Sequence, residues 1–468
     1  MLLSDSTKKT SMTSMSIFML CMYIASYFTL LSFGYYSDLL YFIFIVLSFL
    51  LNAMLTYKGN MKLGFGFLLV SMTYLFQLAR PVSIYLVDYD VIPTYFGFIV
   101  EGDIGRQLYS ASLLEILILI STFSLAYYLC NVDRKSNLIN YSPPHSVKKD
   151  SYFFVMMAFA LIYISVFAIN MHSLFSYVSV EGYLGLYKYF TQMAQSPTFS
   201  YKLYNYMSLL TYSLFAYNYV YNGNKFINKI FIFILLIKGL VFLFLGQRGG
   251  LFALIVFFIY LHSEHKGVKF TKVILIALSL ILLSQVIFFV RLDMSFSDIS
   301  LISSIGNFLY NQGTSFYVYA ISKEIDLPLS SILNSTIPFI KVVYSIFSPG
   351  IPTYEFYPGH FLTRSWSQEA YDAGMGFGWT IFSDVYHIFR GNLILMISGF
   401  FGFGWLINKI EYSKKRSIRY IFLSLAPTLL FLPRAGLTTI VPLIVVSVFM
   451  LYFFRLILVE RLVDEKNS

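Results

Sequence analysis

Charged residues are scarce in this chain: they make up 12% of its 468 residues, whereas 58% are apolar and 19% are aromatic. About a quarter of the residues of a soluble globular protein are charged, so this composition excludes that class. Because the apolar residues recur in long runs over the whole length, the sequence predicts an all-α, polytopic integral membrane protein. Cysteine is rarer still. Only Cys21 and Cys130 occur, which excludes a disulfide framework and a cysteine metal site.

Several signatures of soluble enzymes are also missing. The sequence contains no GxxxxGK[ST] loop, no GxGxxG and no GxSxG with a partnered histidine, so we expect neither a P-loop ATPase nor a bound cofactor. Asp88-Tyr-Asp90 has the DxD form of metal-dependent glycosyltransferases, but so short a pattern is common by chance, and we assign no metal to it. The net charge is +10. Its cations punctuate apolar runs instead of forming one basic face, so no nucleic acid partner is predicted.

Apolar runs approaching the length of a membrane span, about 20 residues, occur twelve times. The expected spans are residues 17–33, 39–57, 63–79, 108–129, 152–170, 205–222, 230–246, 249–262, 273–290, 392–408, 420–433 and 436–454. Cytoplasmic loops of membrane proteins are enriched in lysine and arginine. With the N-terminus in the cytoplasm, 16 of the 21 lysines are cytoplasmic, and the even number of spans returns the C-terminus to that side. One lysine, Lys238, falls within a span.

Arginine does not follow the distribution of lysine. Seven arginines lie at or beyond the outer ends of spans: Arg80, Arg106, Arg248, Arg291, Arg364, Arg390 and Arg434. The planar guanidinium forms two-pronged pairs with phosphate or carboxylate, so an outward-facing anionic ligand would explain these positions. The alternative is that they extend to lipid headgroups or pair with nearby acids. For any single arginine both interpretations remain open.

Two of these arginines are displaced toward the membrane interior. Only 14 residues separate Arg419 from Arg434, which is about 21 Å of helix against a hydrocarbon core of about 30 Å. Arg248 is similarly constrained by Lys266, from which 17 residues separate it. Charged residues at such depth usually face a bundle interior or a wet cavity and mark a substrate path. Arg248 and Arg434 are therefore the best candidates for a binding site.

One segment between expected spans is far longer than the others and runs from Arg291 to Gly391. Long loops in compact proteins are usually functional. We expect residues 291–391 to form one long, structured external loop within a single membrane domain that covers residues 1–468. The loop contains Pro349-Gly350 and Pro358-Gly359, which favour tight turns. Its histidines are His360 and His387, and an imidazole near a phosphate-binding arginine suits transfer from a pyrophosphate-linked donor.

Residues 240–410 also resemble a known family. The features that carry the resemblance are Arg248-Gly249-Gly250 at the start of a span, the long external loop, Pro358-Gly359-His360-Phe-Leu-Thr, and Gly376-Phe-Gly378-Trp-Thr-Ile-Phe-Ser-Asp384-Val-Tyr386. They are similar to the Wzy-type oligosaccharide repeat unit polymerases of bacterial O-antigen and capsule pathways. Members of that family often have Glu where this chain has Asp384 and Gly where it has Arg390.

The resemblance implies a metal-independent glycosyltransferase of the bacterial inner membrane. It would move a growing glycan from undecaprenyl pyrophosphate to the terminal sugar of a new lipid-linked repeat unit, at the periplasmic face. Its partners would be the lipid-linked donor and acceptor, membrane lipid, and a chain-length regulator protein as a further candidate.

The site residues expected under this hypothesis fall into three groups. The pyrophosphate ligands would be Arg248, Arg291, Arg364 and Arg434. The base that accepts the hydroxyl proton would be His360, Glu369 or Asp384, in that order and with little to separate them. Aromatic rings offer broad apolar area for sugar faces, and the candidates are Tyr357, Trp366 and Tyr371. An aromatic belt at the membrane interface would give the same pattern.

Three alternative functions remain open at this stage. A flippase for the same lipid-linked unit would need about twelve spans and buried cations, but it would distribute charge through a central cavity and have short loops on both sides. An O-antigen ligase would differ only in its acceptor, which the sequence does not identify. A structural or partner-binding membrane protein would not explain external arginines at membrane depth.

Overall fold

The computed structural model describes residues 2–34, 37–57, 63–86, 105–130, 149–182, 184–244, 248–292, 301–347, 350–372 and 376–457. All regular elements in these ranges are helices, and no β-strand occurs in them. The all-α prediction is therefore confirmed for the described part of the chain.

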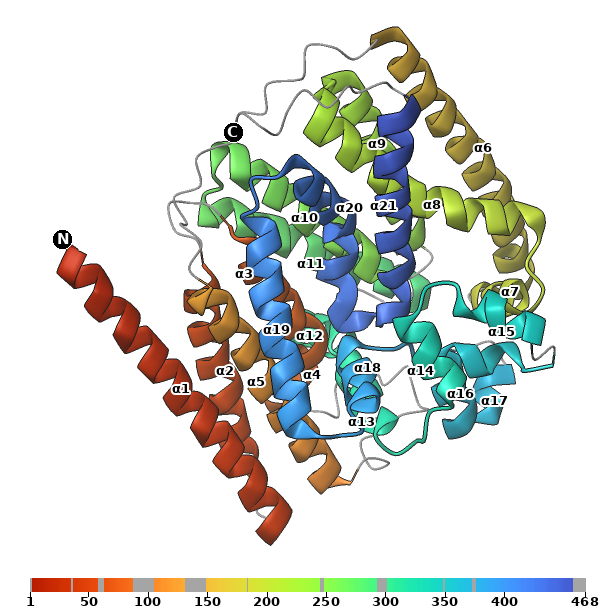
Figure 1. The fold of residues 1–468 in the computed structure, drawn as a ribbon. Helices are drawn as coiled ribbons and strands as arrows, with labels where there is room; N and C mark the ends of the chain where they lie inside the picture. The colour runs from red at the N-terminus through yellow and green to blue at the C-terminus, as the bar shows by residue number, and fades with distance from the viewer. Residues whose placement is uncertain are drawn as a thin grey trace.

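Long helices, interspersed with shorter elements, occupy the first part of the chain (Figure 1). They are α1 (Leu2–Phe33), α2 (Asp38–Thr56), α3 (Phe65–Thr73), the π-helix η1 (Tyr74–Leu78), α4 (Ala79–Leu86), α5 (Arg106–Leu129), α6 (Lys149–Glu181), α7 (Leu184–Gln195), α8 (Phe199–Tyr217), the π-helix η4 (Asn218–Asn222), α9 (Lys225–Phe244), α10 (Arg248–Lys266) and α11 (Phe270–Leu292).

Short helices follow, and long ones return at the C-terminal end. The short elements are α12 (Leu301–Gln312), α13 (Ser315–Ser322), α14 (Leu329–Thr336), α15 (Ile340–Phe347), η6 (Thr353–Phe356), α16 (Pro358–Trp366), α17 (Gln368–Asp372) and α18 (Ile381–Ile388). The last elements are α19 (Leu393–Glu411), α20 (Arg416–Phe431), η7 (Leu432–Arg434), η8 (Leu437–Thr439) and α21 (Val441–Ile457).

Eight helices in the described part are long and apolar enough to cross a membrane. They are Thr10–Phe33, Asp38–Thr56, Phe65–Leu86, Arg106–Leu129, Tyr152–Val180, Lys225–Leu243, Leu393–Glu411 and Leu437–Phe454, and each overlaps an expected span. The other four expected spans are helical, as α8 with η4, α10, α11 and α20. They do not meet the same criteria: α20 has 16 residues, and α8 is rich in tyrosine. The count of twelve spans is not confirmed.

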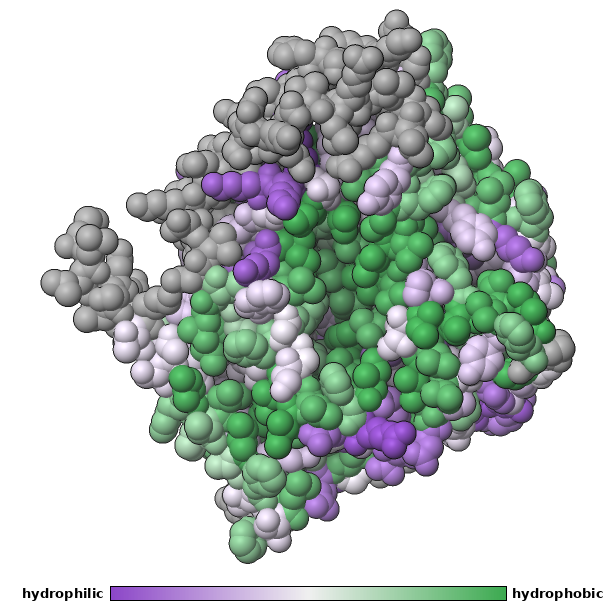
Figure 2. Space-filling view, viewed as in Figure 1, coloured by the Kyte–Doolittle hydropathy of each residue, from purple (hydrophilic) through white to green (hydrophobic). Residues whose placement is uncertain are grey.

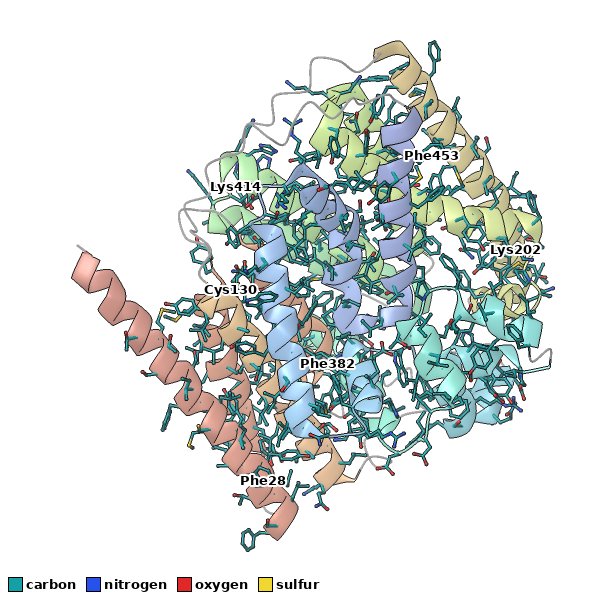
Figure 3. All side chains as sticks on the ribbon, in the orientation of Figure 1. Phe28, Cys130, Lys202, Phe382, Lys414 and Phe453 are labelled. Carbon is teal, nitrogen blue, oxygen red and sulfur yellow. The ribbon has the colours of Figure 1, made fainter. Side chains whose placement is uncertain are left out.

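The side of the membrane that each end faces remains a prediction from the lysine distribution. Figure 1 shows that α1 runs downward from its N-terminus at the left and that α21 ends at the upper end of the bundle, whereas α13 to α18 gather in the lower half. Figure 3 places Lys414, between α19 and α20, at the upper end and Phe28 of α1 at the lower end. The surface between the two ends is largely hydrophobic (Figure 2), as expected for contact with lipid tails.

Helix α5 is the centre of the packing. In its most apolar stretch 89% of the residues are buried, the highest share among the eight candidate spans, and α1, α2, α13 and α19 pack against it. Gly404 of α19 permits the closest approach, because a Cβ at this position would lie 2.3 Å from the Phe123 carbonyl oxygen of α5. Phe382 of α18 stacks on Phe400 of α19 with ring centroids 5.1 Å apart (Figure 3), which ties the short helices to this core.

A buried ion pair and two tyrosine hydrogen bonds connect α1, α5 and α13 through one carboxylate. Glu115 of α5 is 3% exposed, and Lys323, at the end of α13, donates to its two oxygens at 2.9 and 2.8 Å. Tyr27 of α1 and Tyr319 of α13 donate to the same carboxylate. A buried charge with this many partners is satisfied, so the group holds α1, α5 and α13 in register.

The segment expected as one long external loop is folded throughout its described part. Helix α13 is entirely buried and packs against α5 and η1, while α12 packs against α4. The expected tight turn at Pro358-Gly359 is wrong, because Pro358 is the first residue of α16. Its fixed φ suits the first turn of a helix, where a missing N–H costs nothing. The dipeptide Pro358-Gly359 is typical of a turn, but here the packing of α16 favours a helical conformation.

Candidate functional site

The site begins at a break in the regular winding of the span Phe65–Leu86. Residues Tyr74–Leu78 form a π-helix, a rare element that is frequent at functional sites. Gln77 within it is fully buried and donates through Nε2 to the carbonyl oxygen of Pro433 in η7. Its Oε1 has no hydrogen-bond partner among the described residues. The π-helix thus presents a buried polar group beside the turn at 432–434.

Arg80 lies one turn further along, in α4, and is only 5% exposed. Its guanidinium carbon is 3.9 Å from the ring centroid of Tyr310 and 4.1 Å from that of Tyr317, and Nη2 donates to the Tyr310 hydroxyl. No carboxylate pairs with Arg80 among the described residues, and its Nε has no hydrogen-bond partner there. Cation–π contacts hold the charge in place while its hydrogen-bonding capacity stays partly unused.

Gly313 makes this arrangement possible. A Cβ at Gly313 would lie 2.2 Å from the backbone nitrogen of Arg80, so only glycine lets the end of α12 approach α4 this closely. The preceding residue, Gln312, is 1% exposed. Its Oε1 accepts a hydrogen bond of 3.2 Å from Nη1 of Arg434. Arg80 and Arg434 therefore meet at the same end of α12.

Arg434 ends η7 and is half-buried. Its guanidinium carbon is 5.6 Å from the ring centroid of Phe76 in η1. A Cβ at Gly249 would lie 3.4 Å from Cδ of Arg434, so the start of α10 lies beside it. We name Gln77, Arg80, Gln312 and Arg434 the arginine cluster. The side chains of Arg248, which begins α10, and Arg291, near the end of α11, lie outside the described residues.

Asp384 is fastened to the same turn. It lies in the first turn of α18, where the Thr380 side chain caps the helix, and it is 2% exposed. Leu437 N donates to its Oδ2 at 2.5 Å and Trp379 Nε1 to its Oδ1 at 2.9 Å. Burial raises the pKa of the Asp384 carboxyl to about 6, although the hydrogen bonds from Leu437 and Trp379 oppose that rise. A carboxyl of this kind can accept a proton near neutral pH.

His360 forms a second group together with two of the three expected sugar-binding aromatics. On α16, its ring centroid is 5.7 Å from that of Tyr357 and 6.1 Å from that of Tyr371. The Nζ of Lys341 is 5.0 Å from the Tyr357 ring centroid. Burial, and then the charge of Lys341, lower the pKa of His360 below its usual value. The imidazole is thus neutral at pH 7 and able to accept a proton.

A close backbone contact joins this group to Asp384. A Cβ at Gly359 would lie 2.7 Å from the carbonyl oxygen of Gly378, and Phe377 N donates to Thr363 Oγ1 at 3.0 Å. The start of α16 is therefore packed on the strand-like segment that leads through Trp379 into α18. Gly359 thus allows a close contact with the backbone at Gly378, and not with a ligand.

The remaining candidate residues lie elsewhere. Glu369 is exposed on α17. Arg364 lies in the last turn of α16. Its Nε donates to Gln368 at 2.9 Å, and its guanidinium carbon lies 3.8 Å from the Tyr354 ring centroid. None of its contacts in the described part joins it to the arginine cluster. Trp366 is half-buried and packs against the main core.

No group of three or more histidine, cysteine, aspartate or glutamate side chains that could hold a metal ion occurs among the described residues. Asp88 and Asp90 of the DxD pattern lie outside the described residues. Lys238, in the middle of α9, has its Nζ 5.8 Å from the ring centroids of Tyr204 and Tyr212. Its place is therefore between α8 and α9, with aromatic rings as partners.

Four residues of the site escaped selection from the sequence: Gln77, Arg80, Gln312 and Trp379. Arg80 belongs to the external arginines, but nothing in its spacing separates it from the others. Gln312 carries no motif that marks it, and Trp379 lies within the segment 376–386 that resembles the family, where nothing singles it out. The single available signal is the position of Gln77 and Arg80, two polar groups one turn apart at the end of an apolar run, where a charge should face protein or water instead of lipid.

Comparison with known proteins agrees with the sequence resemblance. The family model described as O-antigen polysaccharide polymerase Wzy matches residues 12–466, which is nearly the whole chain. No curated protein and no solved structure matches the chain. The expected family is therefore confirmed, and the chain belongs to the O-antigen polysaccharide polymerase Wzy family.

Proposed function

We propose that this protein polymerises undecaprenyl-pyrophosphate-linked repeat units at the periplasmic face of the bacterial inner membrane, without a metal ion. The observation that carries the proposal is the arginine cluster beside Asp384. Arg80 and Arg434 both lie against the end of α12, at Gly313 and Gln312 respectively. The turn that carries Arg434 also holds the Asp384 carboxylate through Leu437 N. Cations for an anionic leaving group and a base for a hydroxyl proton are the two requirements of glycosyl transfer from a pyrophosphate.

The reaction follows from these roles. The acceptor hydroxyl oxygen bonds to the anomeric carbon of the donor's first sugar, and the bond from that carbon to the pyrophosphate oxygen breaks. The bonding electron pair leaves with undecaprenyl pyrophosphate, whose developing charge Arg434 and Arg80 stabilise. The hydroxyl proton passes to Asp384 or to His360. Arg248 and Arg291 remain further candidates for the pyrophosphate, and Arg364 for a bridging contact at the exposed end of α16.

The lipid tail would approach from the side of the bundle. Figure 2 shows a hollow in the hydrophobic surface over α20, between α19 and α21. The last residues of α20 continue directly into η7, which ends in Arg434. Apolar chain in this hollow would bring a pyrophosphate headgroup to the arginine cluster from within the membrane, consistent with a lipid-linked substrate.

A flippase for the same lipid is the main alternative. Against it, the candidate groups Arg80, Arg434, Asp384 and His360 all belong to elements that meet near the lower end of the bundle in Figure 1, instead of extending along a central path. An O-antigen ligase would share the arginine cluster and the base, and would differ in its acceptor.

The experiment is the size profile of surface polysaccharide in a host strain deleted for this gene, with and without the wild-type copy. A polymerase predicts loss of the ladder with survival of a band that carries a single repeat unit. Loss of all repeat-bearing bands, with lipid-linked units retained at the inner leaflet, would identify a flippase. Transfer by purified protein that survives EDTA supports metal independence, and transfer abolished by EDTA and restored by a divalent cation contradicts it.

A further inference from the structure

A polar cavity of about 470 Å³ lies at the C-terminal end of α18. Its polar lining comes from Lys323 and Asp326, after α13, and from Tyr386, His387 and Arg390, at the end of α18. Its apolar lining is Ile325, Leu327, Leu329 and Ile332. This volume falls within the range of about 300–1,000 Å³ that small-molecule sites usually have, and no residue of the lining has a role in the transfer step above.

The cavity has a lining of two chemically different kinds. Isoleucine and leucine side chains contribute one kind of lining, and charged and aromatic groups contribute the other. A pyranose ring has the same division, because its axial C–H bonds make an apolar face and its hydroxyls make a polar edge. Carboxylate and guanidinium groups hydrogen-bond to vicinal hydroxyls, and Asp326 and Arg390 are the exposed pair available for this.

Arg390 is held at the cavity in an uncommon backbone conformation. Its φ is +52°, in the left-handed region that glycine adopts freely and other residues rarely occupy. The next residue, Gly391, also has a positive φ of +69°. The chain thus turns at the end of α18 with a long cationic side chain at a position where glycine would cost less, which is typical of backbone retained for a binding role.

The indole of Trp379 contacts both His387, which lines the cavity, and Asp384. The Trp379 ring stacks on the His387 ring with centroids 5.7 Å apart and an interplanar angle of 25°, and its Nε1 donates to Asp384 Oδ1. His387 Nε2 lies 2.8 Å from the Ser322 carbonyl oxygen. Nε2 must carry the proton to make that bond, so Nδ1 is the acceptor nitrogen of the ring. Trp379 therefore touches both a wall of the cavity and the candidate base.

We propose that this cavity binds one sugar ring of the acceptor glycan, with Arg390 and Asp326 on its hydroxyls and the isoleucine and leucine side chains against its apolar face. The inference rests on the proposed function and assigns the acceptor to the C-terminal end of α18, apart from the residues proposed for the donor pyrophosphate. Arg390 and Asp326 are specificity-determining residues, and His387 and Trp379 are positioning residues between the bound sugar and Asp384.

The test measures binding of two ligands to the purified full chain in lipid nanodiscs. The first probe is the repeat-unit oligosaccharide released by mild acid from the host's lipid-linked units, which has neither lipid nor pyrophosphate. The second is undecaprenyl pyrophosphate. The variants are Arg390→Gly, which removes the guanidinium while suiting the positive φ, and Asp326→Asn. Lys414→Ala, an exposed cation remote from the cavity, is the matched charge control.

The expected result is a rise in the Kd for the oligosaccharide of about tenfold or more in each cavity variant, because hydrogen bonds to charged groups are stronger than those between neutral groups. Undecaprenyl pyrophosphate should bind both variants as it binds the wild type, and Lys414→Ala should change neither affinity. The proposal would be overturned if the oligosaccharide bound both cavity variants as tightly as it binds the wild type. It would also be overturned if the wild type bound glycerophosphoethanolamine instead of the oligosaccharide and the two variants abolished that binding.

Failure of the proposed function has a different signature. A wild-type protein that binds the oligosaccharide at the cavity but does not restore the ladder would leave the sugar site in place and remove the polymerase assignment. A wild type that restores the ladder, with cavity variants that polymerise at an unchanged KM for the acceptor, would remove the sugar site alone.

Discussion

Leu437, which lies three residues after Arg434, donates its backbone N–H to Oδ2 of Asp384 at 2.5 Å. One short turn between α20 and α21 thus holds the candidate base and one of the candidate pyrophosphate ligands in a fixed relation. Asp384 and Arg434 are 50 positions apart in the sequence, and no local pattern links them. The relation depends on Gly436, where a Cβ would lie 2.6 Å from Asp384 Oδ2 and 2.5 Å from Trp379 Cδ1.

Gly436→Ala should therefore damage the site without damaging insertion. The new methyl group must displace either the carboxylate or the indole, and a displacement of about 1 Å can cost about 100-fold in rate. The ladder of surface polysaccharide should be lost while the protein level in the membrane is unchanged. Gly402→Ala is the matched control, because a Cβ there meets nothing within 4 Å. Equal ladders from the two variants would contradict the role given to the turn.

The rate of transfer should depend on the protonation of Asp384. A base works only in its ionised form, and burial raises the pKa of this carboxyl from 3.8 to about 6. The rate should therefore fall as pH drops through about 6, where an ordinary aspartate would remain ionised. Asp384→Asn should remove most of the activity and the acidic limb together.

His360→Gln distinguishes the second candidate base. If the limb near pH 6 and most of the activity survive in that variant, Asp384 is the base. Loss of activity in His360→Gln, with the limb retained in Asp384→Asn, would assign the role to the histidine.

Arg80 should prove to be as important as Arg434. Arg80→Met retains a long side chain between the rings of Tyr310 and Tyr317 but removes the charge, and a lost charge contact to the leaving group costs about 100- to 1,000-fold in rate. Tyr310→Phe keeps the ring and removes only the hydroxyl that accepts from Nη2, so its effect should be at least tenfold smaller. Single-turnover transfer by purified protein measures both. Similar losses would mean that the hydroxyl, not the cation, matters.

The Glu115–Lys323 pair should govern stability instead of chemistry. Removing one partner of a buried pair typically costs about 3–5 kcal/mol, so Lys323→Met should lower the thermal midpoint of the protein in detergent markedly. The double variant Glu115→Gln with Lys323→Met should recover part of that loss, because no charge is then left without its partner. A double variant less stable than Lys323→Met would show that the tyrosine bonds to Glu115 outweigh the ion pair.

The sequence predicted the helical, membrane-spanning character well because that depends on composition and run length. It also selected Arg434, since the short interval to Arg419 limits the depth that a helix can reach. It did not select Arg80, whose importance comes from Gly313 and two tyrosines far along the chain. The helices of the long segment 301–388 are short, and their positions follow from packing against α4, α5 and η1 more than from their own periodicity. The start of α16 at Pro358 shows the same dependence.

The central claim is that the arginine cluster binds the lipid pyrophosphate, and the most direct measurement is the affinity of the full chain in nanodiscs for undecaprenyl pyrophosphate. Arg434→Ala and Arg80→Met should each raise the Kd by about tenfold or more, and Arg434→Lys should restore only part of the affinity, since an ammonium lacks the two-pronged geometry. Lys414→Ala should have no effect. An unchanged Kd in both Arg434→Ala and Arg80→Met would contradict the account.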